Sequence, residues 1–350
     1  MNDRQNSFDV LRHFAALLVL FSHHFALSGR HVPKFQHWDT YGFVAVAIFF
    51  AISGYFMPAS FNNSENFLVF MEKRCRRIFP GLIVCSLLMC YVIGSIFTPE
   101  PLFQYLTDFS TFKTSVLFSS FLGRPIPGVF SDFIFKDAIN GSLWTLPVEF
   151  LSYIIIGIVL SYTNSWQAVL KLLLFYILTT IVLMITGFNY MFYAVPLNYL
   201  ALFGIAFAGG ALMAMTQKHW FTARYYLAFV AILFLIILKR RGEMQVLGTL
   251  SLAVLTIVIG TSFRDKLIKG RFDISYGIYI YAFPVQQIVI NIITQRFWLS
   301  MAISVALTIF IAILSYRFVE KPFLYANARN KKREQAVGKI ERSGMTNLKA

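Results

Sequence analysis

The chain has 350 residues, of which 57% are hydrophobic and only 13% are charged. A soluble globular protein carries about 25% charged residues, so this composition excludes a soluble catalytic domain and indicates a protein that crosses a membrane many times. The formal net charge is +15, but the basic residues are scattered over short loops and a C-terminal tail. That distribution favours cytoplasmic flanks of membrane helices, surrounded by membrane lipids, and argues against a nucleic-acid partner.

Ten apolar stretches are long enough to cross a bilayer, which requires about 20 residues of helix. In chain order they fall near 8–27, 41–60, 81–98, 143–162, 167–186, 197–215, 223–239, 244–262, 272–294 and 298–318. The predicted fold class is therefore an all-α polytopic membrane protein with about ten transmembrane helices. Residues 1–325 form the predicted transmembrane domain, and residues 326–350 form a basic cytoplasmic tail.

Lysine and arginine favour one side of the predicted bundle. With the N-terminus inside, the inner segments hold 19 of these residues and the outer segments hold 9. Because Lys and Arg collect on the cytoplasmic side, both termini are expected in the cytoplasm. The run Lys239-Arg240-Arg241 disagrees, because it falls on the outer side. Either these side chains snorkel at a helix end, or the bounds predicted for a span near 223–262 are wrong.

The first predicted span carries ionisable residues that a bilayer penalises. Arg12 and His23 are eleven residues apart, so they lie within about 20° of one helix face and about 16.5 Å apart along the axis. Such residues usually face the bundle interior or a wet cavity and are candidate functional residues. Together they predict a polar track through the bundle. Alternatively, Arg12 is an interfacial anchor paired with Asp9, three residues earlier.

The other histidines of this span point elsewhere. His24 lies about 100° around the helix from His23, so the two are not expected to share one task. We expect His24 to have a structural role in helix packing. His13 lies near the inner end, where it is expected to pair with Asp9, four residues earlier.

A basic cluster, EKRCRRIFP at 72–80, follows the second predicted span. It contains Arg74 and Arg77, and guanidinium groups suit polyphosphate binding because they present a planar fork of donors. The alternative is a positive anchor on the cytoplasmic side, which composition alone favours.

A carboxylate lies inside a predicted span at Glu149, in the stretch NGSLWTLPVEFLSY at 140–153. It is about five residues into the helix from the outer side, where a carboxylate is costly unless it is paired or hydrated. Taken alone, Glu149 is either a structural hydrogen-bond partner or a functional residue.

Three further stretches carry weaker signals. Ser53-Gly54 in the second span predicts a helix break or a close helix approach, and the sequence around it lacks the G-x-S-x-G pattern of serine hydrolases. The stretch ISYGIYIYAFPVQQ at 274–287 has a mixed polar and aromatic face that is expected to line a cavity. The longest predicted loop, 99–142, is either a functional lid or an interfacial cap.

In their order, these motifs resemble the acyltransferase 3 family of integral membrane acyltransferases. The matching motifs are FDVLR followed by the His pair, IFFAISGYFM, RCRRIFP, SLWTLPVEF, ISYGIYIYAFP and VEKPF. Each motif alone is weak, but five or six of them in order are specific. The resemblance covers about residues 7–323, which is nearly the whole chain outside the tail.

The resemblance implies a bacterial inner-membrane enzyme that moves an acyl group, often acetyl, from cytoplasmic acyl-CoA to a hydroxyl of a carbohydrate or lipid-linked glycan. By position, Arg12 and His23 match the family's Arg-x10-His pair, and Glu149 matches its acidic residue. These three are the expected catalytic residues, with His23 as general base, because an imidazole of pKa about 6.5 suits that task. Arg74 and Arg77, with Arg12, are expected to bind the donor's phosphates, and no metal is expected.

One departure from the family pattern is clear. Ala282 stands where many relatives carry a histidine, which excludes a role for that histidine here. Two other functions fit ten helices with a polar track: a transporter or flippase of lipid-linked sugar or acyl groups, and a structural subunit of a polysaccharide assembly complex. Dependence on acyl-CoA distinguishes an enzyme from the first. Sensitivity to substitution of Arg74 or His23 distinguishes it from the second.

Overall fold

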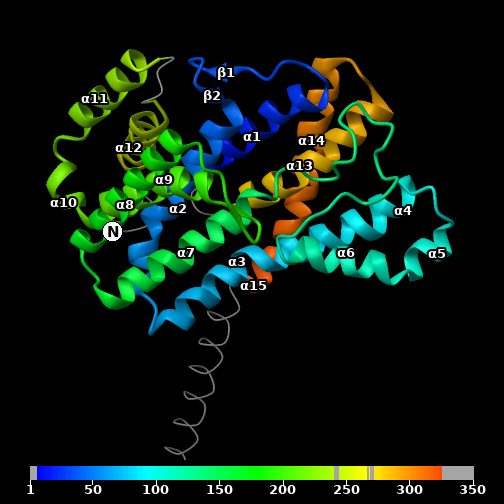
Figure 1. Cartoon of the computed structure of the whole chain (residues 1–350), viewed down its shortest axis with the longest axis horizontal. Coiled ribbons are helices and arrows are strands. Elements are labelled where there is room, and N and C mark those ends of the chain that lie inside the picture. The colour runs from blue at the N-terminus through cyan, green and yellow to red at the C-terminus, as the bar shows by residue number, and fades with distance from the viewer. Residues whose placement is uncertain (1–5, 240–243, 266–267, 269–271, 325–350) are drawn as a thin grey trace, which may run out of the picture.

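The computed structural model describes residues 6–239, 244–265, 268 and 272–324, which fold mainly into helices (Figure 1). The longer helices are α1 (Phe8–Leu27), α2 (Tyr41–Asn62), α3 (Phe67–Leu87), α7 (Thr145–Tyr162), α8 (Trp166–Thr186), α9 (Leu197–Met215), α11 (Arg224–Ile237), α12 (Thr249–Ser262), α13 (Ser275–Ile288) and α14 (Phe297–Ser315). The predicted all-α class is confirmed. The predicted tail, 326–350, lies outside the described residues.

Shorter elements connect the long helices. The short helices are α4 (Gly94–Phe97), α5 (Leu102–Thr107), α6 (Phe109–Ser119), α10 (Gln217–Trp220) and α15 (Lys321–Leu324). π-Helical turns span Leu88–Ile93, Met244–Gly248, Val289–Ile293 and Tyr316–Glu320. Two small antiparallel hairpins pair β1 (Lys34–Phe35) with β2 (Asp39–Thr40) and β3 (Met191–Phe192) with β4 (Val195–Pro196).

Nine helical stretches in the described part of the chain are long and apolar enough to cross a membrane. The third of them, Phe67–Phe97, joins α3, a π-helical turn and α4. The seventh predicted span, near 223–239, is helix α11, whose 14 residues fall short of the roughly 20 that a bilayer requires. The chain is therefore a multi-pass membrane protein, and its described residues contain nine long spans and one shorter apolar helix, where about ten spans were predicted.

The third span begins earlier than the predicted range of 81–98. Helix α3 starts at Phe67 because the side chain of Asn66 accepts a hydrogen bond from a backbone N–H of the first turn at 3.0 Å. The prediction that the basic cluster lies before this helix is wrong. Arg74 and Arg77 lie on the helix itself, so their side chains face neighbouring helices.

Helices α2 and α9 pack closely because glycines lie at their contact. A Cβ atom added to Gly54 would lie 1.9 Å from the backbone oxygen of Phe207, and one added to Gly210 would lie 2.1 Å from that of Ala51. Any larger residue would force the helices apart. The predicted close approach at Gly54 is confirmed, and α2 continues without a break through Ser53.

The helix ends lie on two opposite faces of the bundle. The face that we call the N-terminal face carries the start of α1, where the backbone N–H of Ser7 donates to the carbonyl of Gly260 at 2.9 Å. The other face, which we call the hairpin face, carries both β-hairpins and the irregular segment 120–144. The β1–β2 hairpin runs along the upper edge of Figure 1.

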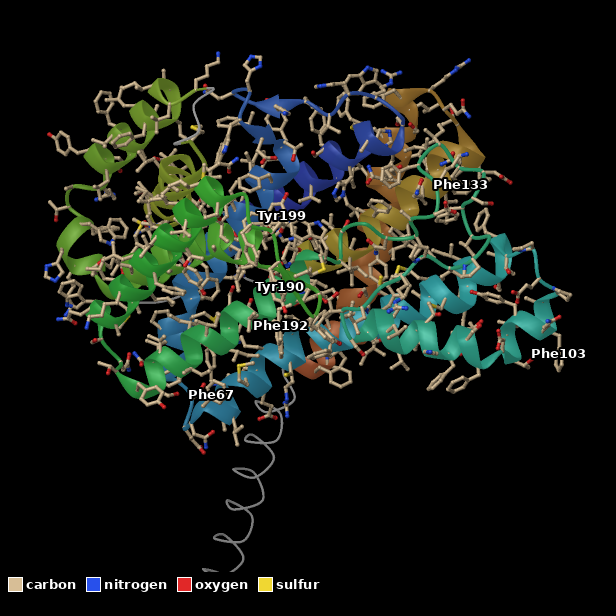
Figure 2. All side chains as sticks on the ribbon, viewed as in Figure 1. Phe67, Phe103, Phe133, Tyr190, Phe192 and Tyr199 are labelled. Atoms are coloured by element: carbon tan, nitrogen blue, oxygen red, sulfur yellow. The ribbon has the colours of Figure 1, made fainter. Side chains whose placement is uncertain are left out.

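The predicted long loop at 99–142 is partly helical, because it contains α5 and α6 before the irregular segment 120–144. Gln287 on α13 donates to two backbone carbonyls of this segment, at 2.8 and 2.9 Å. The hydroxyl of Tyr193 donates to a third carbonyl at 2.7 Å. Segment 120–144 is thus attached to the bundle, whereas Phe103 on α5 lies at the far edge of the molecule (Figure 2).

Candidate active site

Four charged residues meet near the N-terminal face. The Nη1 atom of Arg12 on α1 lies 3.6 Å from Asp9 Oδ1 and 3.5 Å from Asp273 Oδ2. Arg77 on α3 donates from Nη2 to the same oxygen of Asp273 at 2.8 Å. The predicted pairing of Arg12 with Asp9 is confirmed. Asp273 adds a link that holds α1, α3 and the start of α13 together.

Asp273 lies two residues before α13, where it accepts hydrogen bonds from the backbone N–H and the hydroxyl of Ser275. Burial raises the pKa of this carboxyl, but the guanidinium groups of Arg77 and Arg12 and the Ser275 hydroxyl hold the pKa well below its usual value. Asp273 is therefore ionised at neutral pH, and the ion cluster persists there.

Arg74 lies one turn before Arg77 and contacts different neighbours. Its Nη2 atom donates to Ser60 Oγ at 3.1 Å, and its guanidinium carbon lies 5.7 Å from the ring centre of Tyr153. The buried Nε–H group has no hydrogen-bond partner among the residues that the structure describes. The two arginines thus do not present one shared fork in this structure, and Arg74 keeps an unused donor.

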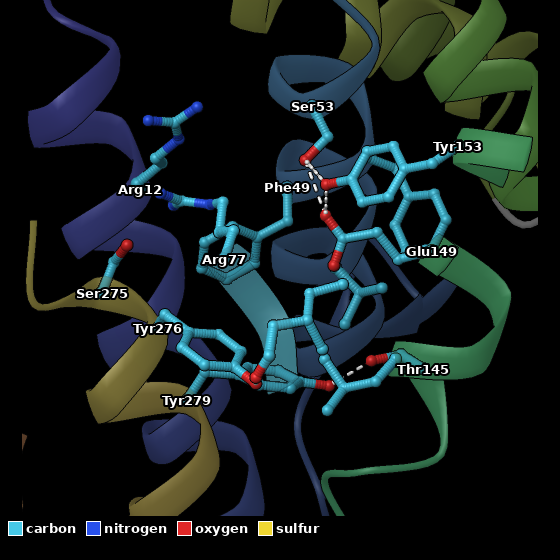
Figure 3. Close-up of a pocket in the computed structure, with 14 residues that line it drawn as sticks. Arg12, Phe49, Ser53, Arg77, Thr145, Glu149, Tyr153, Ser275, Tyr276 and Tyr279 are labelled. Carbon is cyan, nitrogen blue, oxygen red and sulfur yellow. Dashed lines mark hydrogen bonds between the residues drawn. The ribbon is translucent and has the colours of Figure 1, made fainter. Parts of the chain in front are cut away.

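Glu149 is the fifth residue of α7 and faces α2 (Figure 3). Its Oε1 atom accepts a hydrogen bond from Ser53 at 2.8 Å and another from the hydroxyl of Tyr153, one turn later. These bonds offset part of the cost of holding a carboxylate inside a span. Within the described chain, no hydrogen bond joins Glu149 to His23.

One pocket brings together three of the predicted site residues, Arg12, Arg77 and Glu149. In Figure 3 the two guanidinium groups lie on one side of the pocket and the carboxylate lies on the other. The cavity measures about 50 Å³, which is room for a few water molecules. We call it the arginine pocket. Tyr276 of the predicted cavity-lining stretch 274–287 forms part of its wall, as that prediction expected.

His23 lines a second pocket, nearer the hairpin face, which we call the histidine pocket. Its Nδ1 atom lies 3.4 Å from the hydroxyl of Ser142 in segment 120–144. Within the described residues this is the only hydrogen bond to the ring, so Nε2 is available to a ligand. The pocket measures about 260 Å³ and is also lined by Asp39 and Trp144.

Three residues, Val46, Thr145 and Tyr279, line both pockets. The hydroxyl of Tyr279 donates to the carbonyl of Ser142 at 2.7 Å and accepts a hydrogen bond from the hydroxyl of Thr145 (Figure 3). The polar track that the sequence predicted is therefore divided into two compartments. The Tyr279 side chain lies where they meet, and its partner Ser142 also contacts His23.

The neighbouring histidines of α1 bind other parts of the bundle. The Nε2 atom of buried His24 lies 2.9 Å from Ser300 Oγ, and its Nδ1 atom lies 3.0 Å from the side-chain nitrogen of Gln286. His13 Nδ1 lies 2.7 Å from the backbone oxygen of Asp9. His24 is thus buried and hydrogen-bonded between helices, as a structural residue would be, and His13 contacts the backbone of Asp9 where a pairing with its side chain was expected.

Sequence reasoning missed two residues of this site, Asp273 and Tyr279. Asp273 stands just before an apolar run, as a helix-capping acid does, and that signal could have drawn attention to it. Its contacts with two arginines depend on tertiary structure. Tyr279 lies in a stretch expected to line a cavity, but nothing in the sequence pattern distinguishes it from the neighbouring Tyr276 and Tyr281.

The fold and the site together define a multi-pass membrane protein with buried ionisable residues in two adjoining internal pockets. The chain belongs to the acyltransferase 3 family, because the family's acyltransferase-domain model matches residues 5–239. The protein is therefore an acyltransferase. The matched range contains Arg12, His23, Arg74, Arg77 and Glu149, whereas Asp273 and Tyr279 lie beyond it.

Similar proteins cover more than nine-tenths of the chain. The chain is 38% identical over 325 residues to the O-acetyl transferase of Shigella phage Sf6, with 92% of this chain and 96% of that protein covered. It is 27% identical over 349 residues to nodulation protein 10 of Rhizobium leguminosarum bv. viciae, with 91% and 93% covered. It is 24% identical over 397 residues to a putative peptidoglycan O-acetyltransferase of Bacillus subtilis (strain 168), with 95% of this chain but 57% of that protein covered. No solved structure matches the chain significantly.

Proposed function

We propose that this acyltransferase moves an acetyl group from acetyl-CoA, bound on the cytoplasmic side of a bacterial inner membrane, to a hydroxyl of an exported carbohydrate on the other side. Similarity to an O-acetyl transferase and to a putative peptidoglycan O-acetyltransferase supports the acetyl group and the carbohydrate. The observation that carries the proposal is the pair of pockets that meet at Tyr279. One contains arginines that suit a phosphorylated donor, and the other contains a histidine that suits acid–base chemistry.

The arginine cluster supports a donor site at the N-terminal face. Arg12, Arg74 and Arg77 bring three guanidinium groups to this end of the bundle. Arg12 and Arg77 pair with the carboxylates of Asp9 and Asp273, whereas Arg74 forms no ion pair with a described residue and keeps one buried N–H donor unused. The phosphates of acetyl-CoA would supply an acceptor and a negative charge for Arg74. Because the arginine pocket measures only about 50 Å³, the pantetheine arm enters after lining side chains shift.

His23 acts as the general base in this proposal. Its Nε2 atom takes the proton of the acceptor hydroxyl while the hydroxyl oxygen attacks the carbonyl carbon of the thioester. The carbon–sulfur bond breaks, and the thiolate of coenzyme A receives the proton that His23 holds. An ester and free coenzyme A result. This role requires the tautomer in which Nδ1–H donates to Ser142, a contact of 3.4 Å in the structure.

Glu149 belongs to the donor side of this mechanism. Its carboxylate accepts hydrogen bonds from the hydroxyl groups of Ser53 and Tyr153. It faces the guanidinium groups of Arg12 and Arg77 across the arginine pocket. We assign it the task of holding this wall of the pocket in place around the acetyl-bearing arm. In that role it acts on the donor and not through His23.

Tyr279→Ala is expected to uncouple acetyl-CoA consumption from transfer. Removing the ring where the pockets meet admits water to the thioester, so release of coenzyme A without acceptor should rise about tenfold. Thiol release from purified protein in lipid nanodiscs measures this background. Tyr281→Ala is the matched control, because Tyr281 is buried on the same helix and lines neither pocket. An unchanged background in Tyr279→Ala would show that this side chain does not separate the compartments.

Acceptor dependence distinguishes this function from transport without chemistry. The purified protein should consume acetyl-CoA and release coenzyme A only when a carbohydrate acceptor is added, and the acceptor should gain the mass of one acetyl group. A transporter or flippase would move its cargo between the two sides of a vesicle without consuming acetyl-CoA. Mass spectrometry of the acceptor gives the answer directly, and it also identifies any acyl group larger than acetyl.

A further inference from the structure

Two more pockets flank the histidine pocket on the hairpin face. The first, which we call the loop pocket, measures about 380 Å³ and is lined largely by segment 120–144. It shares Trp144 with the histidine pocket, so this residue borders both pockets. The exposed charged residues Arg124 and Asp137 contribute to its wall. The loop pocket thus offers a cation and a carboxylate beside an aromatic ring.

The second flanking pocket, which we call the amide pocket, measures about 480 Å³ and shares Asp39 and Tyr199 with the histidine pocket. Asn198 and Gln245 line it as well. The buried side-chain oxygens of both amides have no hydrogen-bond partner among the described residues. Buried polar atoms in a native structure are normally paired, so these two acceptors point to a ligand that brings O–H or N–H donors.

Trp144 and Tyr199 connect the three pockets. Their ring centres lie 4.7 Å apart, and Trp144 as a residue is 39% exposed. Large aromatic rings with a polar edge suit ligands that combine apolar faces with hydroxyl groups. These two rings border the histidine pocket on the sides of the two flanking pockets. Tyr199 is labelled near the centre of Figure 2.

From this arrangement we infer that the acceptor is a glycan chain of at least three sugars, with the acylated sugar in the histidine pocket and its neighbours in the loop and amide pockets. The inference rests on the proposed function and specifies its acceptor. A single sugar would occupy the histidine pocket of about 260 Å³ and leave both flanking pockets unused. Hydroxyl groups of the outer sugars would donate to the amide oxygens of Asn198 and Gln245, which are buried in this structure and become accessible when these side chains turn toward the amide pocket.

The chemistry of the flanking pockets favours a glycan over a lipid chain. Hydrocarbon would leave the charges at Arg124 and Asp137 and the amide oxygen of Asn198 without partners. A neighbouring pocket, lined by residues such as Phe79 and Phe150, shows what an apolar cavity of similar size looks like in this protein. The loop and amide pockets differ from it because their walls mix polar and aromatic groups.

Acceptor length tests this inference. The surface polysaccharide of the source cell, stripped of esters by mild alkali and cut into fragments of one, two, three and six sugars, serves as the probe. With purified protein in nanodiscs and acetyl-CoA, kcat/KM should rise about tenfold from one sugar to three or more, as one or two further hydrogen bonds form. Equal kcat/KM for every length would overturn the inference.

Variants in the flanking pockets show where the length effect arises. Asn198→Leu keeps the size of the side chain and removes the amide, so the ratio of kcat/KM for six sugars to that for one should fall about tenfold. Arg124→Ala, at an exposed loop position where folding is not at risk, should also lower this ratio. Asn164→Leu on the N-terminal face is the matched control and should leave the ratio unchanged. An unchanged ratio in both flanking variants overturns the inference.

Binding without the donor separates this inference from the proposed function. A fluorescently labelled six-sugar fragment should bind the wild-type protein more tightly than a one-sugar fragment when no acetyl-CoA is present, and Arg124→Ala should reduce the difference. Length-dependent binding without acyl transfer would support a glycan site that extends over the three pockets and would contradict the proposed enzyme activity. Acyl transfer with no length dependence, or no binding of the fragment at all, would contradict this extended site.

Discussion

His23→Ala is expected to lower kcat for acetyl transfer by about 10³-fold, within the range that a general base contributes. The ring has one hydrogen bond in the described structure, a long contact with Ser142, so its loss should leave the fold intact. Transfer of radiolabelled acetyl to the acceptor, normalised to the amount of monodisperse protein, measures the effect. Near-normal turnover in this variant would remove His23 from the mechanism.

His24→Ala is the matched control for that experiment, because the two histidines are neighbours with different surroundings. His24 contacts Ser300 and Gln286, so its removal leaves buried polar groups unpaired at a cost of about 1–3 kcal/mol each. The midpoint of thermal unfolding should therefore fall, while kcat of the folded protein stays within a few-fold of wild type. A loss of kcat as large as that of His23→Ala would mean that the two histidines act together in the reaction.

Arg77→Ala is expected to raise KM for acetyl-CoA by roughly 10- to 100-fold, because a hydrogen bond to a charged group contributes about 1.5–3 kcal/mol. The same change removes the closest basic partner of the Asp273 carboxylate, at 2.8 Å, and leaves Arg12, at 3.5 Å, as the one arginine beside it in the described structure. A partly buried charge that loses its partner destabilises the protein. Binding and stability should therefore fall together in this single variant.

A double variant separates the two effects. Arg77→Ala combined with Asp273→Asn removes the uncompensated carboxylate, so thermal stability should recover while KM for acetyl-CoA stays high. Arg76→Ala serves as the matched control, because Arg76 belongs to the same basic cluster but pairs with Glu72 at the surface. It should change KM by less than about twofold. Recovery of a normal KM in the double variant would show that Arg77 only holds Asp273 in place.

Much of the fold followed from sequence because span length and hydrophobicity are local properties. The apolar runs predicted nine of the long helices, and helix geometry placed Arg12 and His23 on one face. The close approach at Gly54 was also predictable, since a glycine inside an apolar helix usually marks a tight contact. The start of α3 was missed because hydrophobicity is interrupted by the basic cluster, whereas the cap at Asn66 sets the true boundary.

The connections across the site were not predictable in the same way. Asp273 lies 196 residues from Arg77, and nothing local in the sequence shows that they share a hydrogen bond. Facial alignment correctly put Arg12 and His23 on one helix face, but it could not show that Tyr279 from another helix divides the space between them. Such contacts depend on how α1, α3 and α13 pack.

The most direct test of the account places donor and acceptor in different compartments. Purified protein is reconstituted into liposomes and sorted to one orientation, with labelled acetyl-CoA on the side of the N-terminal face and the carbohydrate acceptor on the side of the hairpin face. Label should appear on the acceptor while coenzyme A stays in the donor compartment, and His23→Ala should abolish this transfer. Labelling of the acceptor only when both substrates share one compartment would contradict transfer across the membrane. The absence of labelling in both arrangements would contradict it as well.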